Sequence, residues 1–123
     1  MSGEESLAGF ARRALARRRV AERYRPHIDW LLARLEESRP AVDAVLEESM
    51  PNWRLERLAA IDRNILRIGT TELLYSEDVP GKVAIHEAVR LADRYGSDES
   101  PRFVNGVLDA VFHRGAPAGR SRP

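Results

Sequence analysis

Cysteine is absent from this chain of 123 residues, and lysine occurs once, at position 82. Without cysteine the chain can form no disulfide, and it offers no thiolate to a zinc ion or as a nucleophile. No apolar run approaches the roughly 20 residues needed to span a bilayer, and no signal peptide is recognisable in the sequence. We therefore expect a cytoplasmic protein, and we expect no cofactor.

No group of residues suggests catalysis. The adjacent carboxylates at 36–37, 47–48 and 77–78 would point about 100° apart on a helix, so they form no acid–base pair. The three histidines are too scattered for a metal site, and we interpret them as surface or capping residues. A phosphate-binding loop is also missing, and we interpret Gly106 as a helix-packing glycine. We predict that the protein is not an enzyme.

Apolar residues with helical spacing dominate the second half of the chain. Residues 61–111 contain three amphipathic segments separated by two short breaks, which favours helices that pack as neighbours. Gly96 is expected to end the middle segment in a left-handed conformation, and Ser100 is expected to cap the last one. The apolar positions are Leu58, Ile61, Ile65 and Ile68, then Ile85, Ala88, Ala92 and Tyr95, then Phe103, Val104, Val107, Leu108 and Val111. The sequence therefore predicts an all-α core.

The first half of the chain has the same helical pattern with weaker periodicity. Residues 6–25 and 27–37 each show an apolar face, and Pro40 is expected to start or kink the continuation of the second segment. Trp53 follows a turn at residues 51–52, and we interpret it as a core residue in preference to a base-stacking platform. The polar Gly/Pro/Arg tail, residues 115–123, has nothing to bury and is expected to be disordered.

Several short strings follow one another in an order that resembles the NusB transcription antitermination family. They are NW at 52–53, IDRNILR at 61–67, ELLY at 72–75, DVP at 78–80, KVAI at 82–85 and FVNGVLD at 103–109. The clear match covers residues 52–111, and a weaker pattern extends back to about residue 27. The N-terminal region differs from the family because it is shorter, and the usual pattern of the first helix has no counterpart in it.

The resemblance implies a fold and a function. It implies a compact bundle of about six to seven helices in two packed subdomains. These would form one helical domain over residues 1–114, with an N-terminal part at 6–50 and a C-terminal part at 52–114. The protein would pair with NusE, a small-subunit ribosomal protein, and bind boxA-type single-stranded RNA. With other Nus factors on RNA polymerase it would suppress termination in ribosomal RNA operons.

The resemblance also places candidate site residues on the sequence. The expected RNA-binding residues are Arg12, Arg13, Arg17, Arg18 and Arg19 near the N-terminus, and Glu99, Arg102 and Phe103 around the start of the last helix. Glu72 matches a family position that faces the protein partner near the RNA site. Each residue also has a structural explanation that stays open: a solvated helix face for the arginines, the helix dipole for Glu99 and core packing for Phe103.

A second interpretation of the whole chain also stays open. The chain would be a shortened NusB-like module that acts mainly through protein contacts, with self-association and weak or no RNA binding. The formal net charge of only +1 is compatible with either interpretation, because the basic residues cluster locally near the N-terminus.

The arginine cluster leads to a first prediction. Replacing Arg12, Arg13, Arg17 and Arg19 with alanine should lower RNA affinity and flatten its dependence on salt, while helical content stays nearly the same. Each arginine that no longer contacts a phosphate should change the log–log salt slope by about 0.7 for single-stranded RNA. The slope is measured by titrating labelled RNA at several salt concentrations. An unchanged slope would remove this segment from the RNA surface.

Overall fold

A computed structural model describes residues 9–10 and 25–114 of the chain. Within these residues the fold is all α-helical, as the sequence predicted. The elements are α2 (Arg25–Ser49), the 3₁₀ helix η2 (Leu55–Arg57), α3 (Ala60–Tyr75), α4 (Gly81–Tyr95) and α5 (Ser100–His113). The expected total of six to seven helices is not confirmed, since this described part holds four α-helices and one 3₁₀ helix. The tail at 115–123 and most of the segment at 6–25 lie outside it.

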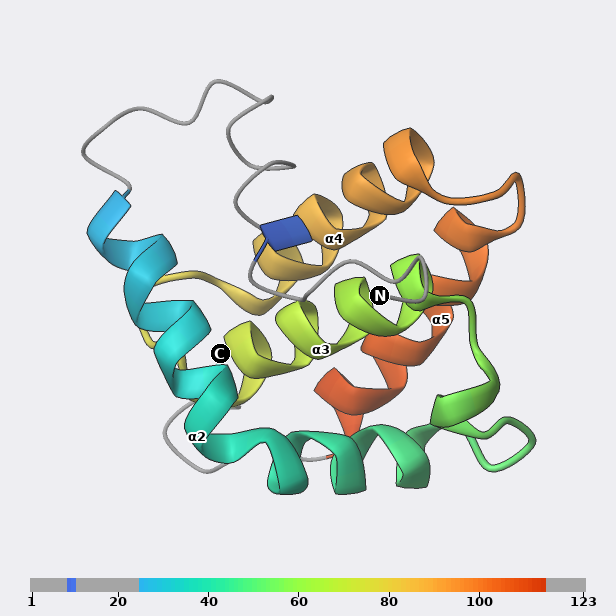
Figure 1. The fold of residues 1–123 in the computed structure, drawn as a ribbon, viewed down its shortest axis with the longest axis horizontal. Coiled ribbons are helices and arrows are strands. Elements are labelled where there is room, and N and C mark those ends of the chain that lie inside the picture. The colour runs from blue at the N-terminus through green and yellow to red at the C-terminus, as the bar shows by residue number, and fades with distance from the viewer. Residues whose placement is uncertain (1–8, 11–24, 115–123) are drawn as a thin grey trace.

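Helix α2 is one continuous helix of 25 residues that contains Pro40. Figure 1 shows that it changes direction about halfway along. Proline removes a backbone hydrogen bond and clashes with the preceding turn, which explains a bend at this place. The kink expected at Pro40 is therefore present, whereas a new helix does not start there. Both arms of α2 face the bundle, one through Leu31 and Leu35 and the other through Val42 and Leu46.

Helix α3 lies at the centre of the bundle and packs against α2, α4 and α5 (Figure 1). Its apolar face, which includes the fully buried Ile65, Leu66 and Leu73, joins the common core. Gly69 lies in the middle of α3, and a Cβ atom built there would lie 2.6 Å from Cδ1 of Leu108 on α5. The missing side chain thus lets α5 approach α3 closely.

The connection between α4 and α5 is compact because of Gly96 and Ser100. Gly96 has a φ angle of −97°, so it is extended and not left-handed as expected. A Cβ atom on Gly96 would instead collide with the Ser100 side chain, which explains the glycine. The Ser100 Oγ atom accepts a hydrogen bond from the Ser97 N–H at 3.0 Å. Ser100 is already inside α5, and the capping position belongs to Glu99, so the predicted cap was one residue late.

Polar contacts join α2 to α3 and hold the segment between the two helices. Arg67 donates from Nε and Nη2 to the two carboxylate oxygens of Asp43, at 2.9 and 3.1 Å. The Glu47 carboxylate accepts a hydrogen bond from the Leu55 N–H at 3.1 Å. Arg63 donates to the Leu58 carbonyl at 3.0 Å. The bonds to Leu55 and Leu58 hold residues 50–59 against the bundle, although many of the side chains of this segment are exposed.

None of the helices in the described ranges is long and apolar enough to cross a membrane.

Gly69 and Gly106 form a matched pair for a test of the packing. Gly69→Ala should lower the free energy of unfolding by about 1–3 kcal/mol, because the new methyl group must displace the buried Leu108 side chain. Gly106→Ala should raise it by about 0.5–1 kcal/mol, since a Cβ there meets nothing within 4 Å and alanine is the better helix former. Urea denaturation measures both. Equal effects in the two variants would contradict the proposed close approach of α5 to α3.

Candidate functional site

A groove of about 640 Å³ lies between the α2–α3 connection and the first half of α5. One wall is formed by residues 49–53 and by the segment from Arg57 to Asp62. The other wall comes from α5 and the residues just before it. The residues on this second wall are Ser97, Glu99, Ser100, Arg102, Phe103, Gly106 and Val107.

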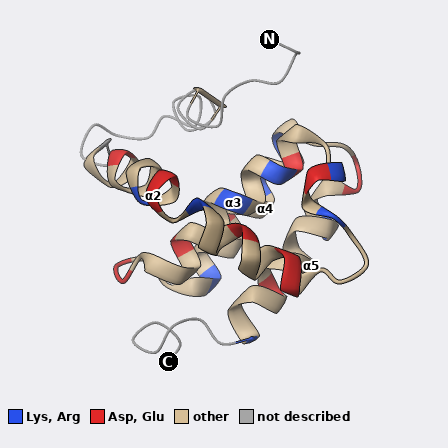
Figure 2. Ribbon diagram, turned by 60° about the horizontal axis from the view of Figure 1, so that its bottom comes forward, with Lys and Arg blue, Asp and Glu red and all other residues tan. Residues whose placement is uncertain are grey.

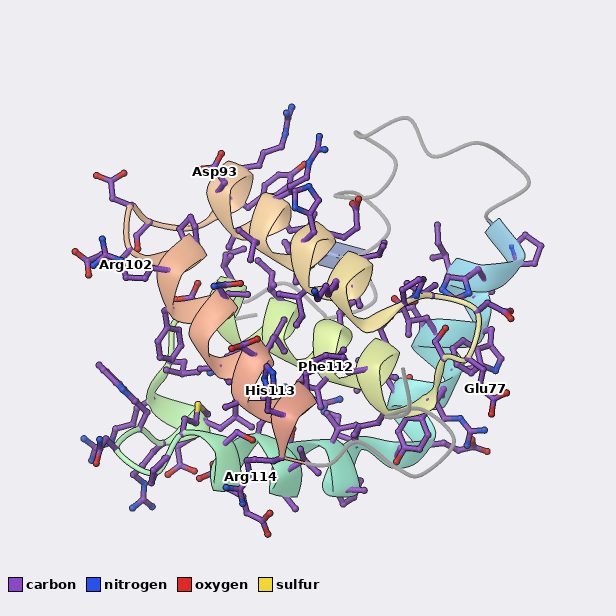
Figure 3. The ribbon with its side chains drawn as sticks, turned by 180° about the vertical axis from the view of Figure 1, so that it is seen from behind. Glu77, Asp93, Arg102, Phe112, His113 and Arg114 are labelled. Carbon is purple, nitrogen blue, oxygen red and sulfur yellow. The ribbon has the colours of Figure 1, made fainter. Side chains whose placement is uncertain are left out.

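Three of the predicted site residues line this groove together. Glu99 and Arg102 are exposed, and Phe103 is half-buried against the core. Arg102 projects outward from the start of α5 (Figure 3). The Phe103 ring lies 5.5 Å from the Trp53 ring, centroid to centroid, in an edge-to-face arrangement. Phe103 therefore belongs both to the core, which is its structural explanation, and to the groove.

Trp53 is not a core residue, so that prediction was wrong. Its exposed fraction is 56%, the highest among the large exposed apolar side chains in the described part of the chain. The backbone explains the difference, because the Trp53 N–H donates to the Met50 carbonyl at 3.0 Å and closes a turn over the end of α2. Met50 fills the core beneath the turn, with 3% exposure, and Trp53 is left at the surface beside α5.

Gly106 is not a packing glycine either, and that prediction was also wrong. It lies one turn beyond Phe103 on α5 and is exposed, and no atom lies within 4 Å of the position that a Cβ atom would take there. Nothing inside the described part of the protein therefore requires glycine here, although glycine in a helix costs about 0.5–1 kcal/mol relative to alanine. The groove wall is open at this point.

Asp62 lines the groove and was not identified as a site residue from the sequence. It lies in the first turn of α3, where a carboxylate is favoured by the helix dipole. Its Oδ1 atom, however, is buried and has no hydrogen-bond partner among the residues that the structure describes. A buried acceptor without a partner is uncommon and costly. Only the tertiary structure reveals this feature, because sequence alone shows an ordinary first-turn acid.

The formal charges around the groove balance. Arg57 and Arg102 carry two positive charges, and Asp62 and Glu99 carry two negative ones. Neither arginine forms an ion pair within the described residues. Figure 2 shows acidic and basic positions side by side where α5 begins. The groove thus offers cations, hydrogen-bond acceptors and aromatic rings together, and it is not a purely basic patch.

The five predicted arginines, Arg12, Arg13, Arg17, Arg18 and Arg19, lie outside the described residues. The described residue nearest to them in the N-terminal sequence is Phe10, which is 3% exposed. Its ring packs edge-to-face on Tyr95 at 6.0 Å between centroids. Tyr95 is the last residue of α4 and comes four residues before Glu99.

Glu72, the predicted partner-binding residue, lies away from the groove. It is ten residues beyond Asp62 on α3, which corresponds to about 15 Å along the helix axis. Its side chain is 14% exposed, and its Oε2 atom accepts a hydrogen bond from His27 Nε2 at 2.8 Å. The sequence analysis predicted that His27 is a surface or capping residue. In the structure it is instead the hydrogen-bond partner of Glu72. The pair joins the start of α2 to the end of α3.

Comparison with known proteins identifies the family. The family model described as "NusB family" matches residues 3–113. This chain belongs to the NusB family. The match extends the resemblance seen in the sequence, which was clear only for residues 52–111, into the N-terminal region. NusB proteins act in transcription antitermination, and the proteins compared below carry that description.

Individual relatives agree with this assignment. The transcription antitermination protein NusB of Desulfotalea psychrophila is 52% identical over 81 residues, which cover 66% of this chain and 57% of that protein. The NusB of Sorangium cellulosum is 45% identical over 98 residues, 80% of this chain and 70% of its own length. The structure of T. maritima NusB superimposes with a TM-score of 0.74 and 34% identity, and covers 81% of this chain and 70% of that one.

The His27–Glu72 pair gives a stability prediction. Glu72→Ala should lower the free energy of unfolding by about 1 kcal/mol, because it leaves the half-buried His27 without its partner. Glu36→Ala, at an exposed position on α2, is the control and should change it by less than about 0.5 kcal/mol. Chemical denaturation at neutral pH measures both. If the two variants are equally stable, the pair does not stabilise the α2–α3 contact.

Proposed function

We propose that this chain is an RNA-binding transcription antitermination factor that pairs with NusE. Together the two proteins would bind boxA-type RNA, join other Nus factors on RNA polymerase, and suppress termination in ribosomal RNA operons. The family supports the general role, since its members are described as transcription antitermination proteins. The aligned region spans only 57–70% of the relatives named above, so the RNA and the partner are part of the proposal.

The observation that carries the RNA proposal is the meeting of Glu99, Arg102 and Phe103 in one groove. Single-stranded RNA is recognised by aromatic rings that stack on bases, by cations that contact phosphates and by acceptors that bind base amino groups. Arg102 is free of ion pairs with described residues, and the Phe103 ring lies at the groove wall. All three kinds of group are therefore available within a short distance.

The anchoring of Phe10 supports a role for the N-terminal arginines on the same surface. Arg12 follows Phe10 by two residues in the sequence. Phe10 itself packs on Tyr95 at the end of α4, next to the connection that leads to Glu99. A basic segment that starts here can supply the phosphate contacts that the charge-balanced groove lacks.

The partner proposal rests on Glu72. The residue lies at the other end of α3 from Asp62, so a protein bound there would leave the groove open for RNA. The carboxylate is held in place by His27, and its exposed edge would accept a hydrogen bond from NusE. An ordered charge of this kind sets the orientation of a partner more than it adds affinity.

A binding measurement with purified components tests the proposal. Fluorescence anisotropy of a labelled boxA-type RNA should show tighter binding than a scrambled RNA of the same composition. NusE from the same organism should increase the difference, at near-physiological salt. Salt must be fixed, because phosphate contacts make affinity strongly salt-dependent. Arg102→Ala should weaken binding to both RNAs to a similar degree if Arg102 contacts phosphate.

The control is Arg90→Ala, which removes an exposed arginine from α4 outside the groove. It should leave the affinity for both RNAs unchanged. Equal binding of boxA-type and scrambled RNA, with and without NusE, would contradict the proposal. The interpretation as a protein-interaction module would then take its place, and sedimentation would show whether the protein self-associates.

A further inference from the structure

Trp53 is a large aromatic side chain that is both exposed and held in place. More than half of its surface is exposed to solvent. Its ring nevertheless contacts Phe103 edge-to-face, and its backbone N–H donates to the Met50 carbonyl and closes a turn. An exposed aromatic residue that served only packing would be expected to turn inward, because burial of its ring is favourable. A fixed ring at the wall of a groove is instead a ready surface for stacking.

The opposite wall leaves room for a flat ligand beside this ring. Gly106 has nothing within 4 Å of the position a Cβ atom would occupy, and it lies one turn beyond Phe103. The groove, with a volume of about 640 Å³, is open to solvent and large enough to receive a small organic group. A glycine that no internal contact requires is typical of a place where another molecule approaches the backbone closely.

Asp62 adds a specific polar requirement. Its buried Oδ1 atom lacks a hydrogen-bond donor in the described part of the protein, and its residue lines the groove. Because this atom is buried, the carboxylate must rotate toward the groove before a ligand can reach it, and the exocyclic amino group of a nucleobase would then supply the missing donor. The balanced formal charge of the groove favours a base over a phosphate, because a phosphate needs a surplus of positive charge.

We infer that Trp53 is the stacking platform for one unpaired base of the bound RNA, and that Asp62 accepts a hydrogen bond from the amino group of this base. The inference rests on the RNA-binding function proposed above, to which it adds a residue and a base preference. Adenine, cytosine or guanine would be accepted at this position in preference to uracil, which has no exocyclic amino group. Arg57 and Arg102, at the groove, would contact the flanking phosphates.

Fluorine NMR provides the first test, with the full chain carrying 5-fluorotryptophan at its two tryptophans and with unlabelled NusE. The resonances of Trp30 and Trp53 are assigned with Trp30→Phe and Trp53→Phe. Addition of boxA-type RNA should shift the Trp53 resonance through the ring current of the stacked base. Trp30 stacks on His27, the partner of Glu72, so NusE is kept saturating throughout; Trp30, which lies outside the groove, should then stay unchanged when RNA is added and serves as the internal control.

Affinity measurements provide the second test. Trp53→Ala should weaken RNA binding about tenfold, the usual size of one base–aromatic stack, and Trp53→Phe should weaken it less. The salt slope should stay the same in both, because stacking releases no counterions. Val83→Ala, which removes an exposed apolar side chain from α4, is the matched control and should have no effect.

A scan of the RNA locates the base. Single abasic substitutions are made along the RNA, and each RNA is titrated with the unaltered protein and with Trp53→Ala. At the position whose base stacks on Trp53, the two proteins should bind the abasic RNA with equal affinity. Placing uracil at that position should weaken binding of the unaltered protein, and Asp62→Asn should reduce the difference between uracil and an amino-bearing base.

The outcomes separate this inference from the proposed function. If boxA-type RNA binds but the Trp53 resonance stays fixed and Trp53→Ala binds normally, the inference is overturned and the RNA function stands. If NusE alone shifts the Trp53 resonance and RNA adds nothing, the groove belongs to a protein contact and the inference is also overturned. If no RNA binds under any condition, the proposed function fails and the inference fails with it.

Discussion

The close packing of α5 against α3 at Gly69 is the contact on which the other features depend. Without a side chain on Gly69, Leu108 of α5 and Ala88 of α4 both approach the middle of α3. This fixes the position of α5, and with it the distance between Phe103 on α5 and Asp62 on α3. One wall of the groove is the α2–α3 connection with the start of α3, and the other is α5, so the contact between α3 and α5 in the core helps to set their separation, together with the Trp53–Phe103 contact.

The segment between α2 and α3 is held by polar bonds and by burial together. The Glu47 carboxylate accepts from the Leu55 backbone on one side, and Arg63 donates to the Leu58 carbonyl on the other. Leu55 and Met50 supply the apolar contacts beneath. Trp53 can therefore stay exposed without loosening the chain around it, and the groove exists before any ligand arrives. A preformed site loses less conformational entropy on binding.

Three groove residues depart from what local stability would favour. Trp53 exposes an apolar ring, Gly106 weakens a helix without a packing reason, and Asp62 buries an acceptor that has no donor among the described residues. Such departures are expected at functional sites, where the missing interaction is made by a ligand. Their concentration in one groove, beside Glu99 and Arg102, is a stronger argument for binding than any one of them.

The sequence by itself determined the helices of residues 61–111, because the apolar spacing of one face is a local property that survives in any fold with a common core. The order of its short motifs also determined the family. Only the tertiary structure decided that Trp53 is exposed, that Gly96 is required by Ser100 and that His27 pairs with Glu72 over 45 positions. These depend on which distant groups become neighbours, and periodicity along one helix carries no information about the helix that packs against it.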